Sequence, residues 1–254
     1  MSGARSIVIP AGGEISPEFA GRIGSPYRAL APLGPSKTPL LQHIVDTLRA
    51  AEPGAEVICV APDAVKRAVD GVDVWLPAGP SGPENMRLGL SRAEAYQPAL
   101  LCTSDLPLMT AESVRAFVAA CRADAQITVG LVRADAYEQA FPGAPPSEFT
   151  KLADVGPVTM AGLFQIQPGL LTRRAALFDT LFRARKSQGR MAGVAGPKLL
   201  WQLATNTLRL SSLTQRAEYL ISGSVQVILD ADPTLAYDAD TLDDYTYAET
   251  RFGT

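Results

Sequence analysis

The sequence predicts a three-layer α/β/α protein built around a mostly parallel, mixed β-sheet. Short apolar runs alternate with amphipathic helical patterns through the first half of the chain. The runs are apolar at consecutive positions, which is typical of strands buried between two layers of helices. No internal repeat, low-complexity segment or Pro/Gly/Ser-rich linker divides the sequence, so we expect a single domain over residues 1–254.

The predicted elements of the first half follow one another as strand and helix. Strands are expected at residues 6–11, 56–61, 72–78, 99–105 and 125–132, and helices at residues 38–51, 62–69, 83–96 and 111–123. Two helix starts carry sequence signals: Thr38 is expected to be an N-cap before Pro39, and Thr110 an N-cap for the helix at residues 111–123.

The strand and helix pattern loosens in the second half. Residues 134–157 are predicted to be a loop, residues 158–168 and 225–232 strands, and residues 170–186 and 196–210 helices, with a last helix beginning near residue 240. The basic segment at residues 183–198 is expected to be a solvated loop, although a clamp over an anionic ligand is the alternative. Residues 135–222 are thus the region in which we expect substrate-specific structure.

Composition excludes several classes of protein. The net charge of −3 provides no positive field for nucleic acid or for an anionic membrane surface. No apolar run approaches the roughly 20 residues that span a bilayer, and no signal-peptide core follows the N-terminus, so we expect a cytoplasmic protein. The three cysteines lie in apolar segments without metal-ligand spacing and are expected to be core residues. The oligomeric state stays open.

The only histidine, His43, limits the available chemistry. Catalytic systems that pair serine or cysteine with histidine would have to use it. It lies in the helical pattern PLLQHIVDTL and is expected on the flank of that helix. Hydrolases with a catalytic triad are therefore disfavoured.

The loop after the first predicted strand has features of a phosphate-binding loop. Gly12 and Gly13 let backbone N–H groups approach an anion without a Cβ in the way, and Arg22 and Arg28 carry donors suited to phosphate oxygens. Neither the G-x-x-x-x-G-K-[ST] pattern nor the G-x-G-x-x-G pattern is present. From these residues alone, an ordinary surface loop is an equally good interpretation.

Acidic residues follow two further predicted strands. Asp105, in CTSDLP, is a carboxylate at the end of a buried strand, where a hard cation such as Mg²⁺ or the capping of a turn would explain it. In YDADTLDDY, Asp238 and Asp240 share one side of an extended segment. They join a metal site if they lie near Asp105; otherwise Asp240 or Thr241 is simply a helix N-cap.

Taken in order, these pieces resemble the MobA-like NTP transferases of the nucleotidyltransferase superfamily. The resemblance rests on AGG…GRIGSPYRALAPLG…KTPLLQHIVDTL, on SDLP and on YDADTLDDY, and it extends over the whole chain. It implies the Rossmann-like GT-A fold of nucleotide-diphospho-sugar transferases. It also implies transfer of a nucleoside monophosphate from an NTP to a small phosphorylated metabolite, with release of pyrophosphate and with Mg²⁺ as cofactor.

The resemblance also implies roles for individual residues. Ala11, Gly12, Gly13 and Arg22 would surround the triphosphate, with Arg22, Arg28 and Asp105 as catalytic residues. Asp105 and Asp240, with Asp238, would hold Mg²⁺, and Ser81, Gly82 and Asn85 would contact the base. Lys151 would contact the acceptor phosphate, unless it is only a solvated charge.

Two departures from the family pattern leave alternative activities open. EISPEFA intervenes between Gly13 and Gly21, and Arg28 stands where the family has a lysine. A catalytically inactive nucleotide-binding homologue is one alternative. The other is a sugar-nucleotide-dependent glycosyltransferase, because one fold serves both chemistries.

Overall fold

The structure, a computed structural model, describes residues 5–93, 97–177, 180, 193–194 and 196–252. The N-terminal half contains strands β1 (Ser6–Pro10), β2 (Pro32–Leu33), β3 (Thr38–Pro39), β4 (Glu56–Ala61), β5 (Val74–Pro77) and β6 (Ala99–Cys102). Its helices are α1 (Pro17–Ile23), η1 (Arg28–Leu30), α2 (Leu40–Ala51), α3 (Asp63–Lys66), α4 (Gly82–Arg92) and α5 (Ala111–Ala120).

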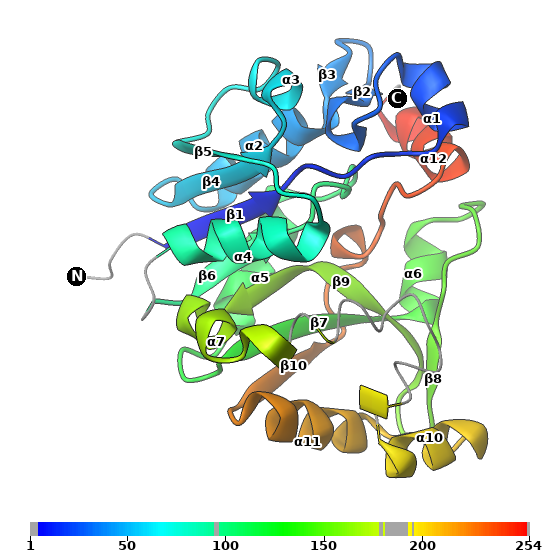
Figure 1. Cartoon of the computed structure of the whole chain (residues 1–254). Helices are drawn as coiled ribbons and strands as arrows, with labels where there is room; N and C mark the ends of the chain where they lie inside the picture. The colour runs from blue at the N-terminus through cyan, green and yellow to red at the C-terminus, as the bar shows by residue number, and fades with distance from the viewer. Residues whose placement is uncertain (1–4, 94–96, 178–179, 181–192, 195, 253–254) are drawn as a thin grey trace.

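The C-terminal half adds strands β7 (Ile127–Arg133), β8 (Thr150–Leu152), β9 (Gly156–Ile166) and β10 (Val225–Leu229). Its helices are α6 (Ala134–Ala140), α7 (Pro168–Arg173), α10 (Pro197–Ala204), α11 (Leu210–Ile221), η2 (Pro233–Leu235) and α12 (Leu242–Arg251). Figure 1 shows how these elements are arranged around the central sheet.

The main sheet has the strand order β10-β7-β9-β6-β1-β4-β5, with β8 paired to β9. β1 pairs in parallel with both β4 and β6, whereas β9 runs antiparallel to β6, β7 and β8. The sheet is therefore mixed but mostly parallel, as predicted. Because β1 and β6 are parallel neighbours, the loops that follow them lie at the same edge of the sheet.

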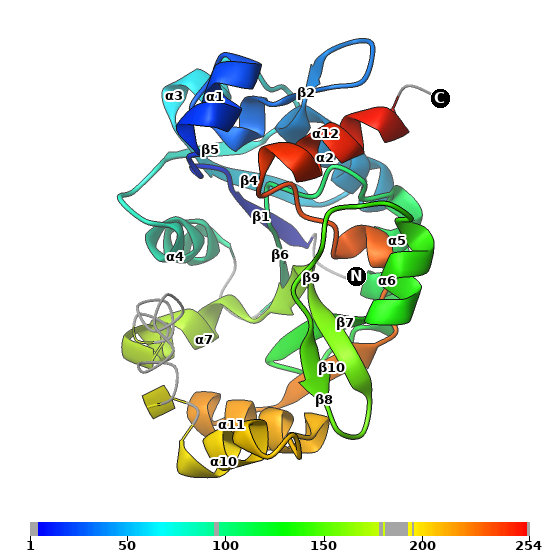
Figure 2. The same ribbon diagram turned by 90° about the vertical axis from the view of Figure 1, so that its right-hand side faces the viewer.

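Helices cover both faces of the sheet, as Figure 2 shows: α4 and α7 on one face, and α2, α5, α6 and α12 on the other. Side chains of β1 alternate between the two sides. Ile7 and Ile9 pack with Leu41 and Ile44 of α2 in one buried cluster, while Val8 packs with Leu90 of α4 in another. The strands are thus buried on both sides, which explains why their sequences are continuously apolar.

Several predicted elements differ from the structure. Thr38 is not an N-cap, because Thr38 and Pro39 form β3 and α2 begins at Leu40 with Pro39 as the cap. The predicted loop at residues 134–157 contains helix α6 and strand β8. The predicted helix at residues 196–210 ends at Ala204, and α11 follows it as a separate helix. The helix predicted at residues 170–186 lies partly outside the described residues.

Other local predictions are confirmed. Thr110 caps α5 through a capping box with Ser113. Cys59 and Cys102 are buried in the core. His43 lies on α2 with its ring 5.1 Å from that of Phe252, in an edge-to-face arrangement. Its environment is therefore a packing contact between α2 and the end of α12.

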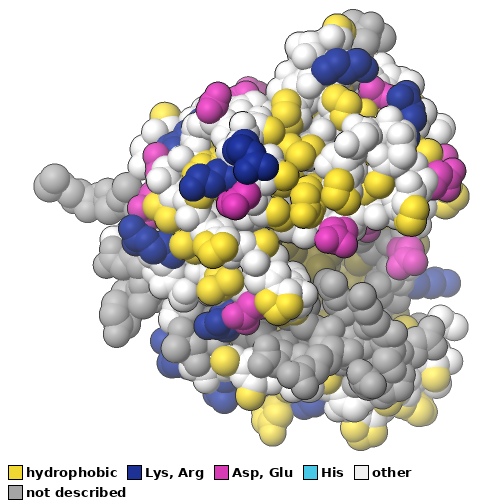
Figure 3. Space-filling model, turned by 45° about the horizontal axis from the view of Figure 1, so that its top comes forward, with side chains coloured by type: hydrophobic (Ala, Val, Ile, Leu, Met, Phe, Trp, Pro, Cys, Tyr) yellow, Lys and Arg dark blue, Asp and Glu magenta, His cyan; other side chains and the backbone are white. Residues whose placement is uncertain are grey.

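Two surface properties bear on partners. Within the described residues, no helix is long and apolar enough to cross a membrane. On the face shown in Figure 3, basic and acidic side chains are interspersed with hydrophobic ones.

Candidate active site

The glycine loop after β1 packs against Asn85 of helix α4. Asn85, a buried residue of α4, accepts a hydrogen bond at its side-chain oxygen from the Gly79 N–H at 2.6 Å. A Cβ added to Gly12 would lie 2.8 Å from the side-chain nitrogen of Asn85, so only glycine fits there without movement. Ala11 is buried and donates its N–H to the Val60 carbonyl at 2.8 Å. Asn85 therefore bonds to the loop that precedes α4 and packs closely against the glycine loop.

The long segment between Gly13 and Arg28 closes on itself. The Arg28 N–H donates to the Gly13 carbonyl at 3.3 Å, the Ile15 N–H donates to the Pro26 carbonyl at 3.0 Å, and Glu14 and Tyr27 form an isolated β-bridge. The two ends of the segment are thus neighbours, and Arg28 directly adjoins the glycine loop in space.

The intervening residues fold as helix α1. Ser16 is its N-cap and accepts a hydrogen bond from the Phe19 N–H, and Gly24 ends the helix with a φ of 74°. The Phe19 side chain is buried, with its ring 5.1 Å from that of Tyr245 on α12. EISPEFA is therefore an ordered insertion packed on the C-terminal helix.

Arg28 joins the two predicted acidic positions. Its Nη1 donates to Asp105 Oδ2 at 2.6 Å and also to Asp240 Oδ1. The side chains of Arg28 and Asp105 are 17% and 21% exposed, whereas that of Asp240 is 59% exposed. The three groups form an ion-pair cluster at the carboxyl edge of β1 and β6, partly open to solvent.

Backbone contacts bring the C-terminal loop to this edge. The Ala239 N–H donates to the Asp105 carbonyl at 2.9 Å, and Ser104 Oγ donates to the Pro10 carbonyl at 3.1 Å. Thr241 then starts α12 through a capping box with Asp244. Thr241 is thus the N-cap, which leaves the carboxylate of Asp240 available to Arg28.

The electrostatics follow from crowding of like charges. Burial raises the pKa of Asp105, and the Arg28 guanidinium opposes this rise. Desolvation in the loop, together with the neighbouring carboxylates of Asp240 and Asp105, raises the pKa of Asp238 to about 7. The carboxyl groups of the site therefore outnumber its cations, and Arg28 is the cation that contacts two of them.

These carboxylates fit a hard cation. Asp105 and Asp240 already share one cationic nitrogen, so an ion placed between them would meet oxygen ligands from both. Among the described residues, no group of three or more His, Cys, Asp or Glu side chains is close enough together to hold a metal ion. A metal here would complete its coordination with water and phosphate oxygens, as Mg²⁺ commonly does.

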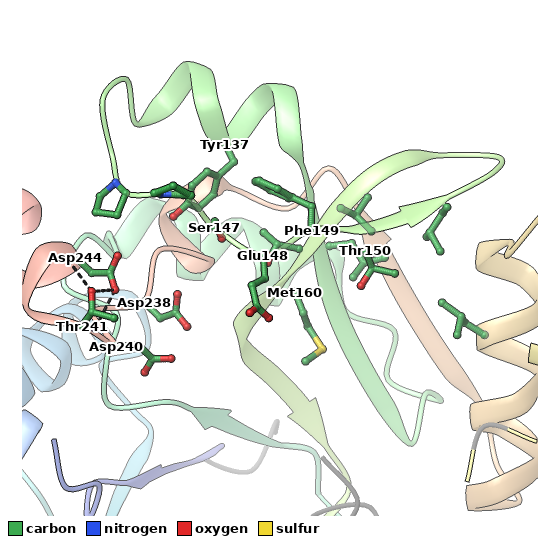
Figure 4. A pocket seen from close by; sticks show the side chains of 17 residues that line it. Tyr137, Ser147, Glu148, Phe149, Thr150, Met160, Asp238, Asp240, Thr241 and Asp244 are labelled. Atoms are coloured by element: carbon green, nitrogen blue, oxygen red, sulfur yellow. Dashed lines mark hydrogen bonds between the residues drawn. The ribbon is translucent and has the colours of Figure 1, made fainter. Parts of the chain in front are cut away.

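A cavity of about 720 Å³ adjoins this cluster. Asp238, Asp240 and Thr241 form one wall, and residues of α6, β8, β9 and the α6–β8 loop form the others. Figure 4 shows Tyr137, Glu148, Phe149 and Met160 around the same space, opposite the C-terminal loop. The cavity is large enough for a small organic substrate.

Other predicted residues lie apart from the ion-pair cluster. Arg22 is exposed on α1 and lies 3.6 Å from Glu249 of α12 in an ion pair. Ser81 is the N-cap of α4 and Gly82 its first residue, both close in sequence to Asn85 on the same helix. Lys151 is exposed on β8 and does not line the cavity, although Thr150 and Leu152 do.

Sequence reasoning missed most of the cavity wall. Tyr137, Glu148, Phe149 and Met160 belong to a segment predicted to be a loop or to a strand without site residues. The sequence FTKL offered little signal, because Phe149 lines the cavity with Thr150 and Leu152 although alternation places it on the side of Lys151. The wall depends instead on the pairing of β8 with β9.

Comparison with known proteins identifies the family to which this chain belongs. A family model described as the MobA-like NTP transferase domain matches residues 7–199, which include β1, the glycine loop, Arg28 and Asp105. The chain belongs to the MobA-like NTP transferase family. Among curated protein sequences, none matches this chain.

Solved structures of other proteins share the fold of this family member. A hypothetical transferase from Thermus thermophilus has a TM-score of 0.84 and 24% identity, covering 95% of this chain and 99% of its own. The 2-C-methyl-D-erythritol 4-phosphate cytidylyltransferase of Thermus thermophilus has a TM-score of 0.54 and 15% identity, covering 98% of each chain.

A third similar structure was solved with a metal. Rv0371c from Mycobacterium tuberculosis H37Rv, in complex with manganese, has a TM-score of 0.51 and 18% identity, covering 97% of this chain and 98% of its own. At these identities the likeness establishes the fold, which is that of the nucleotide-diphospho-sugar transferases. The predicted fold is therefore confirmed.

Proposed function

We propose that this MobA-like protein transfers a nucleoside monophosphate from an NTP to a small phosphorylated acceptor. An oxygen of the acceptor phosphate forms a bond to the α-phosphorus, the bond from the α-phosphorus to the bridging oxygen breaks, and pyrophosphate leaves with the electron pair. The observation that carries the proposal is the cluster of Arg28, Asp105 and Asp240, placed between the glycine loop and the cavity.

The chain's own residues supply positioning and charge in this reaction. We propose that Gly12 and Gly13, with Ala11 beside them, present backbone N–H groups to the triphosphate, and that Arg22 contacts the phosphates by leaving its ion pair with Glu249. Arg28 provides the nearest cation for negative charge that develops on the phosphates. We propose that Ser81 and Gly82, at the start of α4, contact the base, with Asn85 of the same helix bonded to Gly79 and packed beside Gly12.

A divalent cation completes the proposal. Asp105 and Asp240 would hold Mg²⁺ or Mn²⁺, with Asp238 nearby, and such an ion neutralises charge on the phosphate oxygens. The manganese in the Rv0371c structure supports a divalent metal in proteins of this fold. The cavity would take the acceptor, since residues of the 135–222 region line much of it. A phosphorylated acceptor is supported by the name of the similar cytidylyltransferase, which includes a sugar-alcohol phosphate, 2-C-methyl-D-erythritol 4-phosphate.

The test measures pyrophosphate release from each of the four NTPs with Mg²⁺ or Mn²⁺ and a panel of phosphorylated metabolites. We expect turnover with at least one pair of substrates, and a loss of about 100- to 1,000-fold in Asp105→Asn, as for removal of a central electrostatic contact. Asp243→Asn is the matched control, because Asp243 lies in the first turn of α12 and outside the cluster.

Two other outcomes would replace this function. Nucleotide binding without turnover would identify an inactive nucleotide-binding homologue, an alternative that rests on the arginine that bridges both acidic residues. Preferential binding of a nucleoside diphosphate sugar over every NTP would identify a glycosyltransferase. Calorimetric titration of the full chain with NTPs and sugar nucleotides separates the three.

A further inference from the structure

We propose that the cavity beside Asp240 accommodates an acceptor whose body is apolar and carries a positively charged nitrogen, set against Glu148. The inference rests on the proposed function, in which the reacting phosphate of the acceptor lies at the end of the cavity near Asp105 and Asp240. It concerns the remaining part of the acceptor, which the cavity encloses.

The walls of the cavity are suited to an apolar body. Side chains of Tyr137, Phe149, Leu152, Val158 and Met160 line it, together with two prolines. Met160 is 57% exposed, although β9 is a central strand of the sheet. Tyr137, Leu152 and Val158 are almost fully buried, so the apolar surface open to a ligand is that of Met160, the partly buried Phe149 and the prolines. An apolar group that covered it would remove hydrophobic surface from water, which favours binding.

The charged side chains that line the cavity, within the described part of the chain, are all acidic. Glu148, Asp238, Asp240 and Asp244 line it, and no lysine or arginine among the described residues does so. Asp240 is paired with Arg28, and Asp244 accepts hydrogen bonds from Thr241. Glu148 has no such partner within the described part of the chain, and Figure 4 shows its side chain beside Met160, across from the C-terminal loop.

This arrangement discriminates between acceptor bodies by charge. A carboxylate or second phosphate would face Glu148 and Asp238 without a compensating cation from the described walls. An ammonium group would meet the carboxylate of Glu148, next to Phe149 in the cavity wall, and a carboxylate attracts a cation. Lys151 does not reverse this preference, because the alternation of β8 directs Thr150 and Leu152, rather than Lys151, to the cavity.

The probes isolate the charge of the body while keeping the phosphate constant. Phosphocholine carries a quaternary ammonium group, 3,3-dimethylbutyl phosphate replaces its nitrogen by carbon, and phosphoglycolate carries a carboxylate. Isothermal titration calorimetry of the full chain with Mn²⁺ measures the dissociation constant of each probe. We expect phosphocholine to bind about threefold to fivefold more tightly than its neutral analogue, in the range of a partly exposed charge pair, and phosphoglycolate to bind most weakly.

Variants locate the effect at Glu148. In Glu148→Gln the ratio between phosphocholine and its neutral analogue should fall to about one, since the charge is removed with little change in shape. Glu138→Gln is the matched control, because Glu138 is an exposed carboxylate on α6 outside the cavity wall, and it should keep the wild-type ratio.

Three results would overturn the inference: a wild-type ratio of one, tighter binding of phosphoglycolate, or no binding of any probe. An unchanged ratio in Glu148→Gln would overturn it as well. A parallel titration with NTP and Mn²⁺ separates this failure from that of the proposed function. If nucleotides bind and turn over but the ammonium group has no effect, only the acceptor class is wrong.

Discussion

Arg28 holds two carboxylates together, and replacing it should convert this ion-pair cluster into a stronger site for a divalent cation. Asp105 and Asp240 both accept hydrogen bonds from the same Nη1, so their accepting oxygens lie roughly 4 to 5 Å apart. In Arg28→Gln the two negative charges face each other without the guanidinium between them. A Mn²⁺ ion would then no longer compete with a tethered cation.

The structure sets the size of the expected effect. Two like charges at that separation repel by about 3 to 4 kcal/mol at an effective dielectric constant of about 20. The 59% exposure of Asp240 screens this repulsion, so we expect the free energy of unfolding to fall by about 1 to 2 kcal/mol without metal. We expect the dissociation constant for Mn²⁺, measured without nucleotide, to fall about tenfold, which corresponds to about 1.4 kcal/mol.

The assay is a Mn²⁺ titration followed by electron paramagnetic resonance, with thermal unfolding in parallel. Arg49→Gln is the matched control, since Arg49 pairs with Asp73 at a distant position and should leave Mn²⁺ affinity unchanged. Arg28→Lys keeps the charge and should lie between the wild type and Arg28→Gln. Mn²⁺ affinity equal to or below that of the wild type in Arg28→Gln would refute competition between the guanidinium and the metal.

Three further predictions concern the loops around the site and the pH dependence of folding. Gly12→Ala should lower the free energy of unfolding by about 1 to 3 kcal/mol and weaken NTP binding, because the new Cβ meets Asn85. The loss of stability caused by Gly12→Ala should be smaller in a protein that already carries Asn85→Ala. Equal losses with and without Asn85→Ala would contradict the contact. Thr241→Ala should cost about 1 kcal/mol by removing the N-cap of α12, measured by chemical denaturation, whereas Thr246→Ala, farther along the same helix, should cost less. Burial lowers the pKa of His43, so the unfolded chain takes up a proton first as pH falls through about 6.5. Below that pH, the wild type should lose stability relative to His43→Gln by at most about 1.4 kcal/mol per pH unit. Parallel plots of the free energy of unfolding against pH for the two proteins would show that the pKa of His43 does not change on folding.

The sequence carried enough information for the central sheet and for the order of its strands and helices. Ile7, Val8 and Ile9 are apolar at consecutive positions because the two faces of β1 pack on different helices, and that pattern is local. Thr110 was predictable as a cap for the same reason, since its capping partner Ser113 is three residues away. Thr38 was not, because its pairing with Leu33 in a small hairpin depends on a separate segment.

The candidate site could not be predicted from local patterns, because it is formed by contacts between residues far apart in the sequence. Asp105 and Asp240 are brought together by the hydrogen bond between the Ala239 N–H and the Asp105 carbonyl, which no local pattern reveals. Asn85 is predicted from the family resemblance to contact the base, and the structure adds that it is buried, bonded to Gly79 and packed beside Gly12. The order of motifs along the sequence therefore indicated candidate residues for the site, whereas long-range backbone contacts determine which of their side chains meet.

The insertion after the glycines does not separate the glycine loop from Arg28 in space, although its length suggests that it would. Because Glu14 pairs with Tyr27 and Arg28 bonds to Gly13, the inserted helix α1 leaves the spacing between the glycine loop and the following segment short. Phe19 anchors that helix on Tyr245 of α12, the helix that begins directly after the N-cap Thr241 and thus close to Asp240. The insertion thus packs on the helix that follows Asp240. We therefore predict that Arg28, where the family resemblance implies a lysine, affects the chemistry more than the length of the loop does.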